Sequence, residues 1–247
     1  MENTSYIALS RQVSLWNQMD MVSNNLANIN TTGYKSVQPH FAEYLSRSNN
    51  DEHLIADKLS FTHDFGIVRE FKEGALTSTQ NPLDVAIHGN GFFVIDTKDG
   101  PRYTRNGQFK LNNEGMVVTA DNEAVLDSTE RPIFISPTEK KISINQDGSI
   151  ETENGQIAQF KIVAFADMQK LRETHGGLYR NVQGNEIQDA ENIQIEQGMI
   201  EKSNVNSVEQ MTQLIKLQRA YENVQMMIDS EHTRRQNMMS VYAKTSK

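Results

Sequence analysis

The first segment that decides the fold reads ALSRQVSLWNQMDMVSNNLANI, over residues 8–29. Its apolar residues recur at intervals of four, three, four and three, the period of an amphipathic helix with a narrow apolar stripe. A segment near the other end of the chain has the same rhythm. The two stripes consist of Leu15, Met19, Val22, Leu26 and Ile29, and of Leu214, Leu217, Tyr221, Val224 and Ile228. We therefore expect terminal helices whose stripes are buried against each other or against other molecules.

Composition limits the class of protein. The chain has 247 residues, enough for one or two domains, and a net charge of −8. Both ends are close to neutral, so the acidic excess lies in the middle, which argues against a nucleic-acid partner. Its apolar runs, such as Phe92–Ile95, are far too short to span a membrane. The N-terminus has no basic region followed by an apolar run, so no cleaved signal peptide is expected.

The middle of the chain has the turn signals of β structure. A turn at Asn81–Asp84 leads into Val85–Ile87, and Gly89–Gly91 separates this run from Phe92–Ile95, which predicts two short strands across a glycine turn. Further signals predict hairpins at Asn106-Gly107, Asn113–Gly115 and Asp147-Gly148, and a buried strand at Phe160–Phe165. These patterns predict an α+β fold: a largely antiparallel β domain between terminal helices that pair as a coiled coil. The expected segments are an N-terminal helix (1–35), an extended connector (36–75), a central β domain (76–204) and a C-terminal helix (205–247).

The end of the first helical segment is rich in asparagine. Asn24, Asn25, Asn28 and Asn30 precede Thr31-Thr32-Gly33, where a left-handed glycine would close the helix. Intrinsic propensity does not favour so many amides inside a helix. They either form hydrogen bonds across a helix interface and fix its register, or they belong to a frayed, solvated last turn.

No segment has the pattern of a catalytic site. Gly89-Asn90-Gly91 precedes a strand, whereas a phosphate-binding loop precedes a helix. The chain has no cysteine nucleophile and no Gly-x-Ser-x-Gly motif, although carboxylates that meet only in space, as in a glycosidase, stay possible. The spacing of His53, Asp57, His63 and Asp64 fits no zinc template. We therefore expect no enzyme activity, no cofactor and no metal.

Five stretches resemble the bacterial flagellar rod and hook proteins. The N-terminal signature of that family is similar to Asn24-Asn25-Leu26-Ala27-Asn28-Ile29-Asn30-Thr31-Thr32-Gly33-Tyr34-Lys35. The others are Glu73–Leu76 with Asn81–Ile87, Gly89–Phe93, Tyr103–Gly107, and Gly198–Asn206 with the following helix through Tyr221. The resemblance covers nearly the whole chain and weakens at 45–65 and 120–190.

The resemblance implies a function in assembly. Rod subunits of this family stack helically, with terminal helices paired as a coiled-coil layer around the export channel and the β domain outside. The implied partners are further copies, other rod proteins and the flagellar type III export apparatus, and the implied location is the periplasm-spanning rod of the basal body, reached without signal cleavage. Apolar residues beside the stripes complete the expected assembly interface: Leu9, Val13, Trp16, Val208, Met211 and Ile215.

Three alternatives accompany this interpretation. The opening residues and the single small central domain resemble a proximal rod member more than a distal one, which is the second choice. A soluble binding module that uses its β domain is a different class of protein. The terminal stripes could also form an intramolecular two-helix bundle that packs on the β core.

Overall fold

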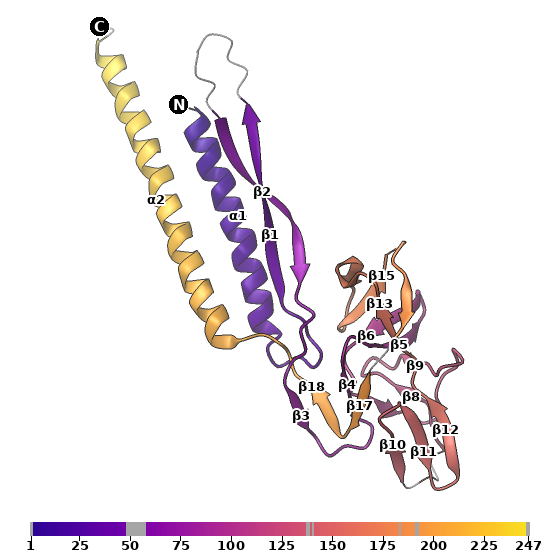
Figure 1. Ribbon diagram of the computed structural model, residues 1–247. Helices are drawn as coiled ribbons and strands as arrows, with labels where there is room; N and C mark the ends of the chain where they lie inside the picture. Colours follow the sequence, from indigo (N-terminus) through magenta and orange to yellow (C-terminus); the bar gives the residue numbers. More distant parts are fainter. Residues whose placement is uncertain are drawn as a thin grey trace. The chain divides into compact units, whose positions relative to one another are not determined.

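The computed structural model describes residues 2–47, 58–136, 139, 141–182, 184–190 and 193–245. They form two compact units (Figure 1). Unit 1 comprises Met1–Ala27, Val37–Val68 and Asn206–Lys247, and unit 2 comprises Asn28–Ser36 and Arg69–Val205. The predicted α+β class is confirmed, because a long helix lies at each end of the chain and antiparallel strands fill most of the middle.

Unit 1 contains both helices. The helix α1 (Glu2–Ala27) and the helix α2 (Ser207–Thr245) lie side by side and run in opposite directions (Figure 1). The side chain of Asn206 caps α2, since its Oδ1 accepts hydrogen bonds from the backbone N–H groups of Val208 and Glu209 at 3.1 and 3.4 Å. Within the described residues, neither helix is long and apolar enough to cross a membrane.

Two observations refine the sequence-based expectations for unit 1. The helix α1 ends at Ala27, so the Thr31–Gly33 signal lies beyond the helix and does not close it. The region expected as an extended connector contains β1 (Val37–Arg47) and β2 (Lys58–Arg69), which form a two-stranded sheet. Part of this region, including His53 and Asp57, lies outside the described residues.

Unit 2 consists of short strands. Their bounds are β3 (Leu76–Ser78), β4 (Val85–His88), β5 (Phe92–Thr97), β6 (Gly100–Thr104), β7 (Lys110–Leu111), β8 (Val117–Val118), β9 (Ala124–Val125), β10 (Ile142–Ile144), β11 (Ser149–Thr152), β12 (Gly155–Gln159), β13 (Ile162–Phe165), β14 (Leu171–Glu173), β15 (Leu178–Asn181), β16 (Ile187–Asp189), β17 (Gln194–Gln197) and β18 (Met199–Glu201), with a 3₁₀ turn at Met168–Lys170.

These strands form one large sheet and several small ones. The large sheet follows the order β14-β15-β6-β5-β9-β8-β7, and β13 and β16 extend it from β5. A three-stranded sheet, β10-β11-β12, and the pairs β17-β4 and β18-β3 complete unit 2. The core is built from aromatic contacts, among them Phe93 edge-on to Phe109 and Phe160 with ring centroids 5.1 and 5.5 Å apart.

The turn signals were informative only where the pairing is local. The hairpins at Asn113–Gly115 and Asp147-Gly148 are confirmed, because β7 pairs with β8 and β10 with β11. The two strands predicted across the glycine turn form as β4 and β5, but they do not pair with each other: β4 pairs with β17, and β5 pairs with β6, β9 and β13. The hairpin at Asn106-Gly107 is wrong, since β6 and β7 do not pair.

Candidate assembly surface and buried junction

The two helices of unit 1 contact each other through an apolar seam. Its buried residues are Ala8, Leu15, Val22, Leu217 and Val224, and its partly buried residues are Met19, Leu214, Ala220, Tyr221 and Ile228. These include most of the two stripes that the sequence pattern predicted. Leu26 and Ile29, at the end of the first stripe, are half-buried and lie outside this cluster. The helices thus satisfy their narrow stripes within one chain.

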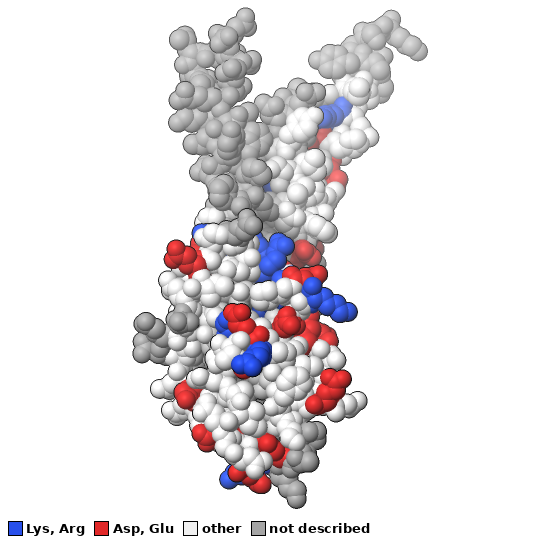
Figure 2. Space-filling view, turned by 90° about the vertical axis from the view of Figure 1, so that its right-hand side faces the viewer, with Lys and Arg blue, Asp and Glu red and all other residues white. Residues whose placement is uncertain are grey.

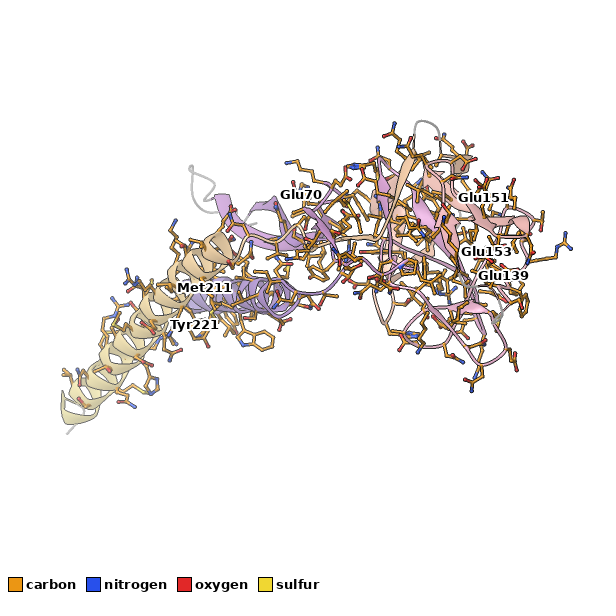
Figure 3. All side chains as sticks on the ribbon, turned by 90° about the horizontal axis from the view of Figure 1, so that it is seen from below. Glu70, Glu139, Glu151, Glu153, Met211 and Tyr221 are labelled. Carbon is orange, nitrogen blue, oxygen red and sulfur yellow. The ribbon has the colours of Figure 1, made fainter. Side chains whose placement is uncertain are left out.

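A second set of the expected interface residues faces solvent. These six side chains are between 51% and 71% exposed: Leu9, Val13 and Trp16 on α1, and Val208, Met211 and Ile215 on α2. At 100° per residue, the exposed group lies roughly 120° from the seam around α1 and roughly 150° from it around α2. Met211 and Tyr221, both labelled on α2 in Figure 3, illustrate the difference, because Tyr221 belongs to the seam and Met211 to the exposed group.

The side chain of Asn25, on α1, holds the first residue of β1 through hydrogen bonds. Its buried side-chain amide donates to the carbonyl oxygen of Val37 at 2.8 Å and accepts from the N–H of Val37 at 2.9 Å. The same Nδ2 donates to Oε1 of Gln210 on α2 at 3.2 Å. One amide therefore replaces a strand partner for both backbone groups of Val37 and also bonds to the second helix.

Segments far apart in sequence meet in unit 2 at what we call the junction: residues 33–36, 70–75 and 201–204. The N–H of Gly33 donates to the carbonyl oxygen of Glu201 at 2.8 Å, and the N–H of Lys202 donates to that of Ala75 at 2.9 Å. Asn204 bonds to both other segments, because its Oδ1 accepts from the N–H of Ser36 at 2.8 Å and its Nδ2 donates to the carbonyl oxygen of Glu70 at 2.8 Å.

Glycine is required where these backbones approach most closely. A Cβ on Gly74 would lie 1.9 Å from the carbonyl oxygen of Lys202. Gly33 has a φ of +70°, and a Cβ there would lie 2.7 Å from the backbone of Arg105 and Asn106. Gly33 therefore serves close packing rather than helix termination.

A buried ionic cluster lies at the centre of the junction. The Nζ of Lys35 is 2.5 Å from Oε1 of Glu201, and the two side chains are 0% and 1% exposed. Lys35 also donates to the carbonyl oxygen of Lys72 at 2.7 Å, and Oε1 of Glu201 accepts from the N–H of Gly74 at 2.8 Å. The guanidinium of Arg105 lies 3.6 Å from Oε2 of Glu201.

Burial decides the electrostatics of this cluster. Desolvation lowers the pKa of Lys35, and the neighbouring Glu201 carboxylate opposes that lowering. Desolvation also lowers the pKa of Arg105. Arg105 has further partners, since it donates to the carbonyl oxygen of Gly89 at 2.6 Å and lies over the ring of Phe92. Glu201 is thus the carboxylate that pairs with both buried cations.

The junction, together with Arg105 and its partner Gly89, brings together the motifs on which the family resemblance depends. Lys35 comes from the Asn-rich motif at 24–35, Gly74 from 73–76, Gly89 from 89–93, Arg105 from 103–107 and Glu201 from 198–206. Lys35 belongs to the motif that the sequence pattern predicted as important, but nothing in the pattern indicated its partners. No local spacing signals a contact between residues 166 positions apart.

The other motif residues differ in their exposure. Asn24 and Thr31 are exposed, and Asn28 and Thr32 are half-buried. Thr31 donates to Oδ1 of Asn28 at 3.1 Å. Tyr34 is buried, and its burial raises the pKa of its hydroxyl.

Acidic side chains are spread over the surface of unit 2. On the face shown in Figure 2 they are interspersed with Lys and Arg, and no broad basic patch appears on that face. Glu139, Glu151 and Glu153 lie in the same region of unit 2 (Figure 3). Glu151 accepts from Asn145 at 2.9 Å and Glu139 from Asn154 at 3.5 Å.

Comparison with known proteins agrees with this distribution of motifs. The model of the "Flagella basal body rod protein" family matches residues 6–35, that of the "Flagellar hook protein FlgE/F/G D1 domain" matches residues 86–152, and that of the "Flagellar basal body rod FlgEFG protein C-terminal" matches residues 196–241.

Similar proteins match along most of their length. The chain is 36% identical over 237 residues to a flagellar basal-body rod protein FlgF of Caulobacter vibrioides, covering 93% of this chain and 94% of the relative. It is 33% identical to a FlgF of Rhizobium meliloti, covering 94% of both chains. It is 30% identical to a flagellar basal-body rod protein FlgG of Bacillus subtilis, covering 88% of this chain and 90% of the relative.

Proposed function

The chain belongs to the flagellar basal-body rod protein family and is a structural rod subunit; we propose that it polymerises helically through α1 and α2. In this proposal the two helices pair as a coiled coil in each subunit. The polymer forms part of the drive shaft and surrounds the export channel. The role is mechanical, and no catalysis is involved.

The observation that carries the proposal is the division of the apolar residues between two faces of the helix pair. The seam, with Leu15 and Leu217 at its buried centre, already holds α1 against α2. The exposed groups around Val13 and Met211 have no function in that seam. Exposed apolar residues that line one face of a helix are typical of a surface that binds another molecule.

We assign the chain to the proximal rod, in the position of FlgF. Relatives named FlgF are 31–36% identical to this chain, and relatives named FlgG are 29–31% identical. A distal rod subunit of the same family is the alternative within this class. A soluble binding module is less well supported, because it would not need a second apolar face on its helices.

The remaining parts of the proposal concern partners and location. Neighbours in the rod are further copies of this chain and other rod proteins. The subunit reaches the basal body through the flagellar type III export apparatus without cleavage of a signal peptide. The acidic surface of unit 2 favours solubility before assembly.

A substitution on the exposed face tests this function. Ile215→Asp places a charge on the α2 surface without removing a seam residue. We expect a folded, exported protein that forms no rod, measured by swimming and by electron microscopy of basal bodies. Asn223→Asp is the matched control, because Asn223 is exposed on α2 away from Ile215 and its substitution should preserve swimming.

Deletion of residues 205–247 gives a second, coarser test. Loss of the rod with expression and export intact supports assembly through α2. Normal rods and swimming in either the deletion or the Ile215→Asp strain would contradict the proposal and favour the binding module.

A further inference from the structure

The two exposed apolar groups of unit 1 have matching spacing. Along α1 the residues Leu9, Val13 and Trp16 are four and then three positions apart. Along α2, read backwards from Ile215 to Met211 and Val208, the intervals are also four and three. An antiparallel alignment therefore places all three residues of one group opposite all three of the other. A parallel alignment sets Val13 against Thr212 instead of Met211.

These groups cannot meet within one chain. Gln12 bonds to Gln225 and Asn25 bonds to Gln210, which fixes the register of α1 against α2. In this register the position opposite Val13 is near residue 223. Met211 is 12 residues from that position, which corresponds to about 18 Å along a helix. The exposed groups therefore lie at different heights along the same helix pair.

We propose that a second copy of the chain, in the same orientation, lays its α2 group on the α1 group of its neighbour with an axial shift of about 18 Å. This contact sets Leu9 against Ile215, Val13 against Met211 and Trp16 against Val208. The inference rests on the proposed function, because it specifies which surfaces of the helices make the assembly contact.

Charge at the surface agrees with this alignment. Arg11 is the one basic residue between Leu9 and Trp16, and Glu209 is the one acidic residue between Val208 and Ile215. Both side chains are exposed. The antiparallel alignment places Arg11 opposite Gln213, one helical turn from Glu209 of the other copy. Opposite charges are therefore close, and no like charges face each other within the aligned segments.

The axial shift has a consequence for symmetry. The contact is heterologous, since the surface of α1 on one copy meets the surface of α2 on the next. A heterologous contact closes into a ring only when the shift along the axis is zero. A shift of about 18 Å displaces each subunit along the helix axis relative to the one before it. The contact therefore generates an open helical array in which all subunits have the same orientation.

Cysteine cross-linking tests this register, and the chain contains no cysteine of its own. The test variant carries Val13→Cys and Met211→Cys, and the matched control carries Leu9→Cys and Val208→Cys. The control cysteines sit about 10 Å out of register in the proposed contact, too far apart for a disulfide. Each variant is expressed as the sole copy, and isolated basal bodies are oxidised and separated by gel electrophoresis without reductant.

We expect the test variant to give a ladder of covalent multimers and the control to stay monomeric. A ladder from the control, or none from the test variant in basal bodies that contain rods, would overturn the register while leaving the proposed function intact. Val13→Cys alone should stay monomeric. A dimer from that single variant would show an inverted, two-fold contact and would also overturn the inference. Absence of the protein from the rods would instead count against the proposed function.

Discussion

Replacing Glu201 by glutamine should destabilise unit 2 severely. The substitution preserves the size of the side chain but removes its negative charge, which lies between the ammonium of Lys35 at 2.5 Å and the guanidinium of Arg105 at 3.6 Å. Both cations are buried, with side chains 0% and 1% exposed, so water does not replace the lost carboxylate.

The magnitude follows from that burial. Removing one partner of a buried ion pair costs about 3–5 kcal/mol, since the other charge is left uncompensated in a medium of low polarity. Here one carboxylate pairs with two cations, which places the expected loss at the upper end of that range. Most single domains are stable by only about 5–15 kcal/mol, so the variant should be partly unfolded at modest temperature or low denaturant concentration.

The loss should depend on pH in a definite direction. The folded pKa of Lys35 is already below its ordinary value of 10.5, and losing Glu201 removes an interaction that raises it. Between the folded and unfolded pKa values the unfolded chain binds more protons, so stability rises with pH in that window. In the variant the folded pKa of Lys35 is lower still, so the variant gains more stability with rising pH than the native protein does. The difference in free energy of unfolding between the two proteins should therefore shrink as pH rises toward 10.5.

Urea denaturation, monitored by circular dichroism and by amide exchange in unit 2, measures both effects. Glu130→Gln is the matched control, because it removes a carboxylate paired with Lys161 that is 73% exposed, and it should change stability little. The double variant Lys35→Met with Glu201→Gln should lose less than the sum of the single losses, because the two residues act on each other. If Glu201→Gln were as stable as Glu130→Gln, the reasoning about the cluster would be refuted.

Three further changes test other contacts. Asn25→Ala removes both side-chain bonds to the backbone of Val37 and should cost about 1–3 kcal/mol in unit 1, measured by denaturation. Gly74→Ala should prevent unit 2 from folding, detected as loss of amide protection, because its Cβ would lie 1.9 Å from the carbonyl oxygen of Lys202. Burial raises the pKa of Tyr179 to about 12, so stability from its neutral hydroxyl is lost as pH rises from 10 toward 12, and alkaline titration should show a late tyrosinate absorbance step that Tyr179→Phe abolishes.

The terminal helices could be predicted because their signal is local. The period of Leu15, Met19 and Val22 is set by the turn of the helix itself, and the same holds for Leu217 and Val224. The periodic pattern did not separate the buried seam from the exposed groups. That distinction depends on which face of α1 meets α2, and the register of the pair is fixed by side-chain bonds such as that of Gln12 to Gln225.

The junction could not be predicted because its contacts are distant in sequence. The density of asparagine before Gly33 indicated unusual amides, and Asn25 does bond to the second helix. Nothing in the spacing identified Val37 as its main partner or Glu201 as the partner of Lys35. The glycine at position 33 predicts a helix end, whereas in the structure its backbone approaches Arg105 in unit 2. The presence of a glycine alone does not show whether it closes a helix or lets two backbone segments approach each other.

The size of the exposed apolar groups explains how a rod subunit can avoid premature association. Three exposed side chains on each helix, centred on Val13 and Met211, make only a small contact. A stable pair of proteins generally buries at least about 1,000 Å² in its interface. Two free copies would therefore separate. A subunit within a growing array contacts one neighbour through its α1 group and a second neighbour through its α2 group. Such a subunit buries twice the area that it buries in an isolated pair, and this is possible only when earlier subunits are already in place. The same narrow stripes thus favour addition to an existing rod over association in dilute solution.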